Sequence, residues 1–594
     1  MNKVTKANAT RLNASHCSCH LPPALQEAPV AVYFLPGAQT ADDDLEGLDR
    51  AGVLQYVALW KPAVARRPYL STDAVAELVV SVHDSVANAS IMVEWLPGKL
   101  PLSNWTAVPA GAATVIPFSL AGLPPVVHDK VHVHLRRGNE EFDLKKVLFF
   151  YRVEAPPKGS HFVQVDYSRR SLLVNGAPLL GSGYYDSQTV GPANLTRQAQ
   201  AGHTWNMRYL TSNSPKEPHE RMPDAFVQDY LDWAHAAGMY IMLDLHSEFE
   251  QLVHDPEQKQ ARSVVQKTVE SFRNHPALLG WYICDDCLNM YLWRRGEAHA
   301  PDNLYKELKA MDPYHPVIGA VEYWNMDVFT SPEVSYTPLL DVVMIENYVP
   351  ALGNNAHTNT YPDLGPDGAM QAWPMTWEPI VNCAGPFKVV HLRDDLKWKE
   401  KKLLMYSLPW LSAVMGGVPH QLHFRLFPFE PPSHTSSLYE AMMLESGRYS
   451  HVARRVRDIL LAPPSGVREP VLADAASDMP KSGGCLQCAR IWRRPVPGEP
   501  AAFCALIVIV NCESKAATAK FRLLGAEAWP GASESSLRRL GFPPLPLRRR
   551  RRVRRGQGAK FSGGVLEVSM DPSDTHVYVT RGCEAPSRDL LRFV

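Results

Sequence analysis

The segment MPDAFVQDYLDWAHAAGMYIMLDL, residues 222–245, predicts a helix that is followed at once by a buried strand. Pro223 suits the first turn of a helix, and Gly238 is typical of the residue that ends one. Apolar side chains recur every three or four residues between them, which gives the helix one hydrophobic face. That face consists of Phe226, Val227, Tyr230, Leu231, Ala234 and Ala237. The apolar run YIMLDL then supplies a strand, so the segment indicates one unit of an alternating α/β fold.

The same unit recurs along the central part of the chain. Residues 264–272 carry a second helical stripe that stops before His275-Pro276, and the run ALLGWYIC follows as a strand suited to burial on both faces. Eight strand candidates are found in this way. They begin near Pro178, Trp205, Tyr240, Leu279, Pro316, Asp341, Ala372 and Gln421. Eight strands joined by helical or long-loop connections predict a central (β/α)₈ TIM barrel.

Two similar segments, APPKGS at 155–160 and APPSG at 462–466, bound this central region. Pro-Pro and Gly break regular structure and suit exposed connections. On both sides the pattern changes to short strands separated by turn residues, which predicts a β-sandwich domain at each end. The predicted divisions are a disordered segment 1–27, a carbohydrate-binding-like N-terminal β-sandwich 28–156, the barrel 160–462 and a C-terminal β-sandwich 467–594.

Composition argues against two classes of partner. Lys+Arg and Asp+Glu both number 61, so net charge gives no bias toward nucleic acid. No run approaches the ~20 uninterrupted apolar residues that span a bilayer, so no membrane span is expected. The arginine-rich run at 548–555 follows PPLPL, and we interpret it as an exposed, solvated loop in preference to a protease-processing site or a nucleic-acid patch. The expected partner is a carbohydrate, and the sequence leaves the oligomeric state open.

Five N-x-[ST] sequons favour an extracellular or lumenal location, in the secretory pathway or a lysosome-like compartment. They lie at Asn8, Asn13, Asn88, Asn104 and Asn194. The first residues lack the apolar core of a signal peptide, so no leader is visible. The ten cysteines are too few for a disulfide scaffold, but their even number permits a few bridges.

No metal and no cofactor is expected from the motifs. Cys485-x-x-Cys488 resembles half a zinc site, but the similar pair Cys284-x-x-Cys287 lies far away in a different pattern. His132 and His134 in VHVHL form an H-x-H pair on one face of a predicted strand. Solvated or packed histidines are far commoner than metal ligands in such a position, and we favour that interpretation.

Polar residues follow several of the predicted barrel strands. They are Arg208 after strand two, Asp244 and His246 after strand three, Asp285 and Asp286 after strand four, Glu346, Asn347 and Tyr348 after strand six, and Glu378 after strand seven. Barrel enzymes carry their reactive groups at this end of the strands. Clustered carboxylates suit glycoside cleavage, in which one protonated carboxyl donates to the leaving oxygen and a second carboxylate attacks or stabilises the sugar.

Five segments together resemble the barrel motifs of glycoside hydrolase clan A, nearest to family-two-like enzymes related to β-galactosidase and β-glucuronidase. They are LLVNGAPLLGSGYY, the arginine in NMRYL, HPALLGWYICDD, MIENYVP and PMTWEP, in this order. The resemblance covers about 450 residues loosely. It implies a TIM-barrel glycosidase with flanking β domains.

The resemblance also implies roles for individual positions. Asp286 falls where the family has its acid/base glutamate, and Glu378 falls where it has its nucleophile. Tyr348 matches a tyrosine that often contacts the nucleophile, and Arg208 matches an arginine that helps to keep it ionised. His246, Asp285 and Trp377 are expected to bind substrate, Asp285 through a sugar hydroxyl and Trp377 by stacking. The family carries Glu where this chain has Asp286, and Asp is one methylene shorter.

We therefore expect a metal-independent O-glycosidase that acts on a β-linked glycan or glycoconjugate with retention. Glu346 is a rival for the second carboxylate. The alternative is a weak or inactive saccharide-binding pseudoenzyme on the same barrel. A third reading makes the β domains adhesive modules and the barrel a spacer. The sequence does not fix the sugar, the linkage, or exo against endo action.

Overall fold

The computed structural model describes about half of the chain in detail. The described residues are 54–59, 69–82, 89–108, 113–125, 127–142, 147–166, 171–185, 191–211, 221–285, 300–322, 341–346, 380–384, 406, 409–410, 413, 420–424, 435–461, 487–496, 499–511, 517–522, 537–540, 560–562, 565–571 and 574–583.

A closed barrel of eight parallel strands forms the centre of the structure. Its strands are β14 (Ser182–Tyr185), β15 (Trp205–Arg208), β16 (Tyr240–Asp244), β17 (Leu278–Asp285), β18 (Val317–Glu322), β19 (Val342–Glu346), β20 (Ile380–Ala384) and β21 (His420–Phe424). Each strand pairs with the next in chain order, and β21 pairs with β14 to close the ring. The central barrel predicted from the sequence is confirmed.

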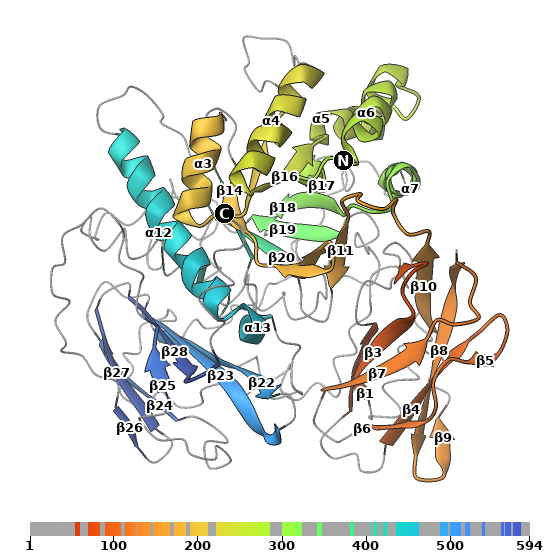
Figure 1. Ribbon diagram of the computed structural model, residues 1–594, viewed down its shortest axis with the longest axis vertical. Coiled ribbons are helices and arrows are strands. Elements are labelled where there is room, and N and C mark those ends of the chain that lie inside the picture. The colour runs from red at the N-terminus through yellow and green to blue at the C-terminus, as the bar shows by residue number, and fades with distance from the viewer. Residues whose placement is uncertain are drawn as a thin grey trace, which may run out of the picture.

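Helices separate several of these strands and cover the outside of the barrel (Figure 1). They are α3 (Pro192–Ala201), α4 (Asp224–Ala237), α5 (His246–His254), α6 (Lys259–Phe272), α7 (Ala300–Met311), α12 (Thr435–Arg455) and α13 (Arg457–Leu460). Helix α4 ends as predicted, because Gly238 adopts a left-handed conformation with φ 72°. Its buried residues are Val227, Tyr230, Leu231 and Ala234, all on the predicted face. No described helix is long and apolar enough to cross a membrane.

Two barrel strands differ from the sequence-based count. The first was expected near Pro178, but Pro178 belongs to a short antiparallel hairpin outside the barrel. Asn175 and Gly176 form its turn with φ values of 50° and 82°, which is the left-handed pair that an Asn-Gly hairpin turn requires. The seventh was expected to start near Ala372, but β20 starts at Ile380. Glu378 lies outside the described residues.

The lower part of the barrel interior is filled by Trp205. A Cβ atom on Gly183 of β14 would lie 1.8 Å from the Trp205 backbone oxygen and 2.5 Å from its indole ring. Only glycine fits at such a distance, so Gly183 leaves room for the neighbouring strand and its large side chain. Trp205, Met207, Met242, Ile318 and Met344 belong to one buried interior cluster. The barrel is thus a packed core and not a pore.

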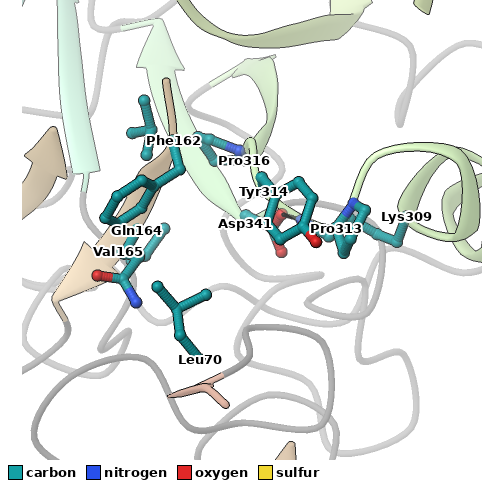
Figure 2. Close-up of a pocket in the computed structure, with 10 residues that line it drawn as sticks. Leu70, Phe162, Gln164, Val165, Lys309, Pro313, Tyr314, Pro316 and Asp341 are labelled. Atoms are coloured by element: carbon teal, nitrogen blue, oxygen red, sulfur yellow. Dashed lines mark ion pairs between the residues drawn. The ribbon is translucent and has the colours of Figure 1, made fainter. Parts of the chain in front are cut away.

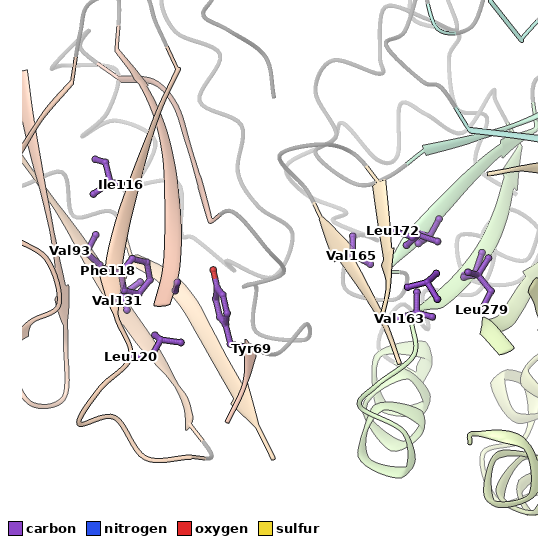
Figure 3. Packing of buried hydrophobic residues seen from close by; sticks show 14 of the residues in the cluster. Tyr69, Val93, Ile116, Phe118, Leu120, Val131, Val163, Val165, Leu172 and Leu279 are labelled. Carbon is purple, nitrogen blue, oxygen red and sulfur yellow. The ribbon is translucent and has the colours of Figure 1, made fainter. Parts of the chain in front are cut away.

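Antiparallel sheets make up the region before the barrel. The three-stranded sheet holds β1 (Leu54–Leu59), β3 (Val75–Val82) and β7 (Ala113–Ser119). The seven-stranded sheet holds β2 (Tyr69–Leu70), β4 (Ala89–Trp95), β5 (Leu100–Pro101), β6 (Thr106–Val108), β8 (Val127–Arg137), β9 (Glu140–Phe142) and β10 (Val147–Val153). The hairpin sheet holds β11 (Val163–Asp166), β12 (Ser171–Val174) and β13 (Ala177–Leu179). Buried residues of both larger sheets, the hairpin sheet and the barrel interior belong to one cluster (Figure 3).

Two further antiparallel sheets follow the barrel. One holds β22 (Gln487–Val496), β23 (Glu499–Asn511), β25 (Leu537–Arg539) and β28 (Thr575–Thr580), and the other holds β24 (Ala517–Arg522), β26 (Lys560–Ser562) and β27 (Val565–Met570). A disulfide joins Cys504 of β23 to Cys583 after β28. In Figure 1 these sheets and the N-terminal sheets lie on two sides below the barrel. The β-rich character of both ends fits the expectation, while the two-sandwich arrangement and the domain limits stay predictions.

Candidate active site at the C-terminal rim of the barrel

Four of the first six barrel strands end on a carboxylate residue. These residues are Asp244 of β16, Asp285 of β17, Glu322 of β18 and Glu346 of β19. Glu322 was missed in the sequence analysis, although the run VIGAVE carries the same signal of an apolar strand closed by an acid. Because the strands are parallel, all four lie at the same end of the barrel.

Strand register places these four residues in the inward row of the barrel. Ile318, Ala320 and Met344 are buried in the interior cluster, and Ala320 pairs with Asp285. Glu322 lies two residues beyond Ala320, and it pairs with Glu346. On β16, Asp244 follows Met242 of the same cluster by two residues. Since alternate residues of a strand belong to the same row, the register assigns all four to the row that also holds these interior residues.

A register shift in β17 decides whether Asp285 shares that row. Tyr282 pairs with Ile318, but Cys284 then pairs with Gly319, so the strand has one extra residue between them. The irregularity re-aims the end of the strand and brings Asp285 into the inward row. Asp286 follows the last residue of β17 and lies outside the described residues. The roles of Asp286, Tyr348, Trp377 and Glu378, none of which is described, stay predictions.

The Asp244 carboxylate forms hydrogen bonds with residues that follow two neighbouring strands. Its Oδ2 accepts a hydrogen bond from the backbone N–H of Leu210 at 2.8 Å. Its Oδ1 accepts from the backbone N–H of His246 at 3.0 Å and lies 2.6 Å from His246 Nδ1. The carboxylate thus ties the exits of β15 and β16 together and fixes the ring of His246. Asp244 acts as a positioning residue for this histidine.

His246 stands where the sequence placed it, just after β16. Its ring centroid lies 4.8 Å from that of Tyr209 and 6.4 Å from that of Tyr282, an inward residue of β17. Its Nε2 lies 3.3 Å from Ser247 Oγ, which in turn lies 2.6 Å from Thr211 Oγ1. With Nδ1 directed at Asp244, Nε2 is the nitrogen turned toward hydroxyl groups. The arrangement suits a histidine that binds a sugar hydroxyl.

Arg208 contacts the helical layer. It shares a face of β15 with Asn206, whose side chain bonds Gln198 of α3 and Tyr230 of α4. The Arg208 guanidinium lies 4.9 Å from the centre of the Phe226 ring, at the start of α4. This is cation–π geometry, so one contact of Arg208 is with α4. Its predicted effect on Glu378 stays a prediction.

A second buried acid near the rim forms an ion pair with a neighbouring arginine. Glu248 of α5 accepts a hydrogen bond from Arg221 Nη1 at 2.8 Å, and Arg221 also donates to Thr268 of α6. Burial raises the pKa of the Glu248 carboxyl, and Arg221 opposes that rise. This pair joins α5 to α6 behind the rim, and we assign it a structural role.

A small cavity lies at the other end of the barrel (Figure 2). It is lined by Pro316 and Asp341, which directly precede β18 and β19, and by Leu70 of the N-terminal sheet. Its volume of about 20 Å³ has room for about one water molecule. Asp341 accepts from the Val317 N–H at 2.9 Å and lies 3.3 Å from Lys309 Nζ, so it secures the bottom of the barrel. This cavity is too small for a sugar.

The described fold is a closed barrel of eight parallel strands, four of which end on an acidic residue. No family model and no curated protein matches the chain. Among solved structures, it is similar to a glycoside hydrolase family 5 protein from Bacteroides vulgatus ATCC 8482, with 11% identity, TM-score 0.45 and coverage of 73% of this chain and 95% of that one.

Two further similar structures are β-glucuronidases. One, from Ruminococcus gnavus, has 10% identity, TM-score 0.30 and coverage of 66% of this chain and 68% of that one. The other, an FMN-binding β-glucuronidase from Facaelibacterium prausnitzii L2-6, has 12% identity, TM-score 0.31 and coverage of 89% and 72%. Likeness at these TM-scores carries no argument about activity, and the barrel is established by its own strand pairing.

Proposed function

We propose that this protein is a glycoside hydrolase that cleaves O-glycosidic bonds of a β-linked glycan or glycoconjugate, with retention of configuration. The observation that carries the proposal is the inward row of Asp244, Asp285, Glu322 and Glu346 at one end of a closed barrel. Carboxylates at this end are what a two-acid mechanism needs. The resemblance of five sequence segments to clan A glycosidases points to the same chemistry.

In this mechanism one carboxyl donates a proton to the leaving oxygen and the other attacks the sugar carbon. Asp286 is the proposed acid/base and Glu378 the proposed nucleophile, both from the resemblance. Asp285 and Glu346 are the rival pair, because register places them in the inward row. His246, held by Asp244, would bind a substrate hydroxyl.

A panel of aryl β-glycosides tests the proposal. The protein should release the aglycone from at least one member, and Glu378→Gln should abolish release while circular dichroism stays unchanged. If Glu346→Gln abolishes release and Glu378→Gln does not, the rival pair is supported. Asp229→Asn, on the exposed side of α4, is a matched acid-to-amide control that should retain full activity. Absence of release from every glycoside would contradict the enzyme proposal.

Saccharide binding without turnover is the second candidate function. It is favoured by Asp286, whose side chain is one methylene shorter than the glutamate that the family carries at the acid/base position. Calorimetric titration with the glycans of the same panel separates the two functions, because a pseudoenzyme would show binding heats and no product.

We further propose that the protein resides in an extracellular or lumenal compartment. The Cys504–Cys583 disulfide supports this, since disulfides persist in oxidising compartments. Asn104 of one sequon is exposed, as glycosylation requires. Expression in a secretory host, with mass spectrometry before and after removal of N-glycans, tests the proposal. Unmodified Asn104 and free thiols at Cys504 and Cys583 would count against it.

A further inference from the structure

Three side chains with metal-binding groups meet on the N-terminal seven-stranded sheet, apart from the barrel rim. Glu94 of β4 is the direct cross-strand partner of His132 of β8. His134 follows two residues later on the same face of β8. One ligand atom from each of the three side chains lies within 4.8 Å of the other two. The pairing of β4 with β8 therefore adds a carboxylate to the H-x-H motif.

The distances are close to those of an occupied site. The two imidazole centroids lie 4.3 Å apart, and His134 Nε2 lies 3.7 Å from Glu94 Oε1. Ligand atoms of a tetrahedral zinc ion with bonds of about 2.0–2.1 Å are about 3.3 Å apart. Rotation of the side chains would bring the ligand atoms to that distance, while the pairing of β4 with β8 holds the three residues in register.

The cluster faces away from the core of the sheet. Val131, Val133 and Leu135 alternate with the histidines and are fully buried, so the histidines occupy the opposite face. The side chains of His134 and Glu94 are 16% and 20% exposed. They are sheltered, yet an ion can reach them from solvent. A fourth coordination position is then open to water.

A second carboxylate lies beside the other ring nitrogen of His134. Glu141 Oε1 of β9 lies 3.4 Å from Nδ1 of His134, on the opposite side of the ring from Glu94. Metal-binding histidines usually direct their other ring nitrogen at a carboxylate or carbonyl, which fixes the tautomer and orients the ring. Glu141 occupies that position here, and Nε2 is thereby left to face Glu94 and the ion.

The described arginine on this face of β8 contacts a tryptophan ring. Arg136 follows His134 by two residues, but its guanidinium stacks 4.5 Å from the centre of the Trp105 ring. Two carboxylates, Glu94 and Glu141, contact His134 of the histidine pair. These two carboxylates favour the binding of a divalent cation.

We propose that Glu94, His132 and His134 bind one divalent transition-metal ion of the Zn²⁺ class, with Glu141 orienting His134. Two imidazoles and one carboxylate suit Zn²⁺ better than Mg²⁺ or Ca²⁺, which prefer all-oxygen sites. The ion would join β4 to β8 and stabilise the N-terminal sheets. The sequence-based interpretation of His132 and His134 as solvated or packed histidines was drawn from β8 alone, and the proposal differs from it because strand register adds the facing Glu94.

Cobalt(II) titration of the chelator-treated full-length protein tests the site. Co²⁺ should produce visible d–d absorption that saturates at one equivalent, and one equivalent of Zn²⁺ should remove it. The double variant His132→Gln/His134→Gln should lose this absorption. Ser90→Ala, on the same face of β4, should retain it. Equal absorption in the double variant and the parent protein would overturn the proposal.

Two further variants guard against misfolding and against other sites. Glu94→Gln preserves shape and should weaken Zn²⁺ at least tenfold in competition with a chromophoric chelator, and Glu141→Gln should weaken it by about 10–100-fold. Zn²⁺ should raise the Tm of the parent protein but not that of Glu94→Gln. A thiolate-to-cobalt charge-transfer band that disappears in Cys485→Ser/Cys488→Ser, with unchanged binding in Glu94→Gln, would assign the metal to the cysteines and refute the cluster.

Discussion

Glu322 and Glu346 are direct register partners at the C-terminal ends of the neighbouring strands β18 and β19. Adjacent strands lie about 4.8 Å apart, so the two residues are backbone neighbours at this end of the barrel. The register therefore adds Glu322 to the acids whose substitution tests the candidate site.

Substitution of each acid should show which of them are catalytic and which only bind substrate. In an active protein, the true acid/base and nucleophile should each lose at least about 10²–10⁴-fold in kcat when changed to the amide. An acid that only binds a hydroxyl should lose about 10–100-fold in kcat/KM, equivalent to one charged hydrogen bond. Steady-state rates for Asp285→Asn, Asp286→Asn, Glu322→Gln, Glu346→Gln and Glu378→Gln provide the ranking. Uniform losses across the five would argue against a defined catalytic pair.

His246 and Asp244 should act as a coupled pair. His246→Ala is expected to raise KM about tenfold with a smaller change in kcat, because it removes one hydroxyl contact. Asp244→Ala should raise KM to a similar extent, since it frees the His246 ring, and should also lower stability by leaving the Leu210 N–H unsatisfied. The double variant should then be no worse in KM than either single one. Additive losses would show that Asp244 acts independently of His246.

Elements with local signals could be predicted from the sequence, and elements set by distant contacts could not. Helix α4 carried Pro223 at its start and Gly238 at its end, and both predictions hold. The first barrel strand was misplaced because the apolar run before it was read as a strand, although Asn175-Gly176 marks a hairpin turn. The facing of Glu94 and His132 depends on strand register across more than thirty residues, which no local pattern encodes.

The same difference between local signals and distant contacts applies to the residues of the candidate site. Carboxylates at strand ends can be found from the sequence, because an apolar run that closes on an acid is a local pattern. Whether Asp285 falls in the inward row depends on an irregularity inside β17 that periodicity does not reveal. The placement of Arg208 against Phe226 likewise follows from which face of β15 meets α4. The sequence thus predicts which acids follow the strands, and the strand register determines which of them lie side by side.

His161 should make stability depend on pH below neutrality. Burial lowers the pKa of His161 from 6.5 to about 4, with a smaller contribution from His315. Its Nε2 lies 2.7 Å from the Leu278 carbonyl at the bottom of the barrel, which suits a neutral ring that donates there. As pH falls from 6.5 to 4, the unfolded chain takes up a proton that the folded protein refuses.

Stability that is present above pH 6.5 should therefore decline by up to about 3 kcal/mol as pH approaches 4. Urea unfolding at a series of pH values measures the decline. His161→Phe should flatten the curve in this window, whereas His254→Gln, an exposed histidine of α5, should leave it unchanged. A curve of the same slope in His161→Phe would assign the dependence to other groups.

Asp312 should be essential for the lower end of the barrel. It is fully buried, and its Oδ2 accepts from Trp281 Nε1 and lies 2.8 Å from His315 Nδ1. Burial alone would raise the pKa of Asp312, but His315 holds it below its ordinary value. Asp312→Ala leaves both partners without an acceptor and should cost roughly 3–5 kcal/mol in the free energy of unfolding. Asp229→Ala, exposed on α4, should change stability little, and equal losses in both would refute a special role.

The Cys504–Cys583 bridge should stabilise the C-terminal sheets through the unfolded chain. It closes a loop of 79 residues and joins β23 to the end of β28, which are already paired. Such a loop predicts a gain of about 2–4 kcal/mol, because the bridge removes conformations from the unfolded state more than it adds contacts to the folded one. Cys504→Ser/Cys583→Ser should therefore unfold at lower urea concentration with a larger m-value, since the unbridged chain expands further. Dithiothreitol should shift the parent protein toward the variant and leave the variant unchanged; equal midpoints for the parent and the variant without reductant would show that the bridge contributes nothing.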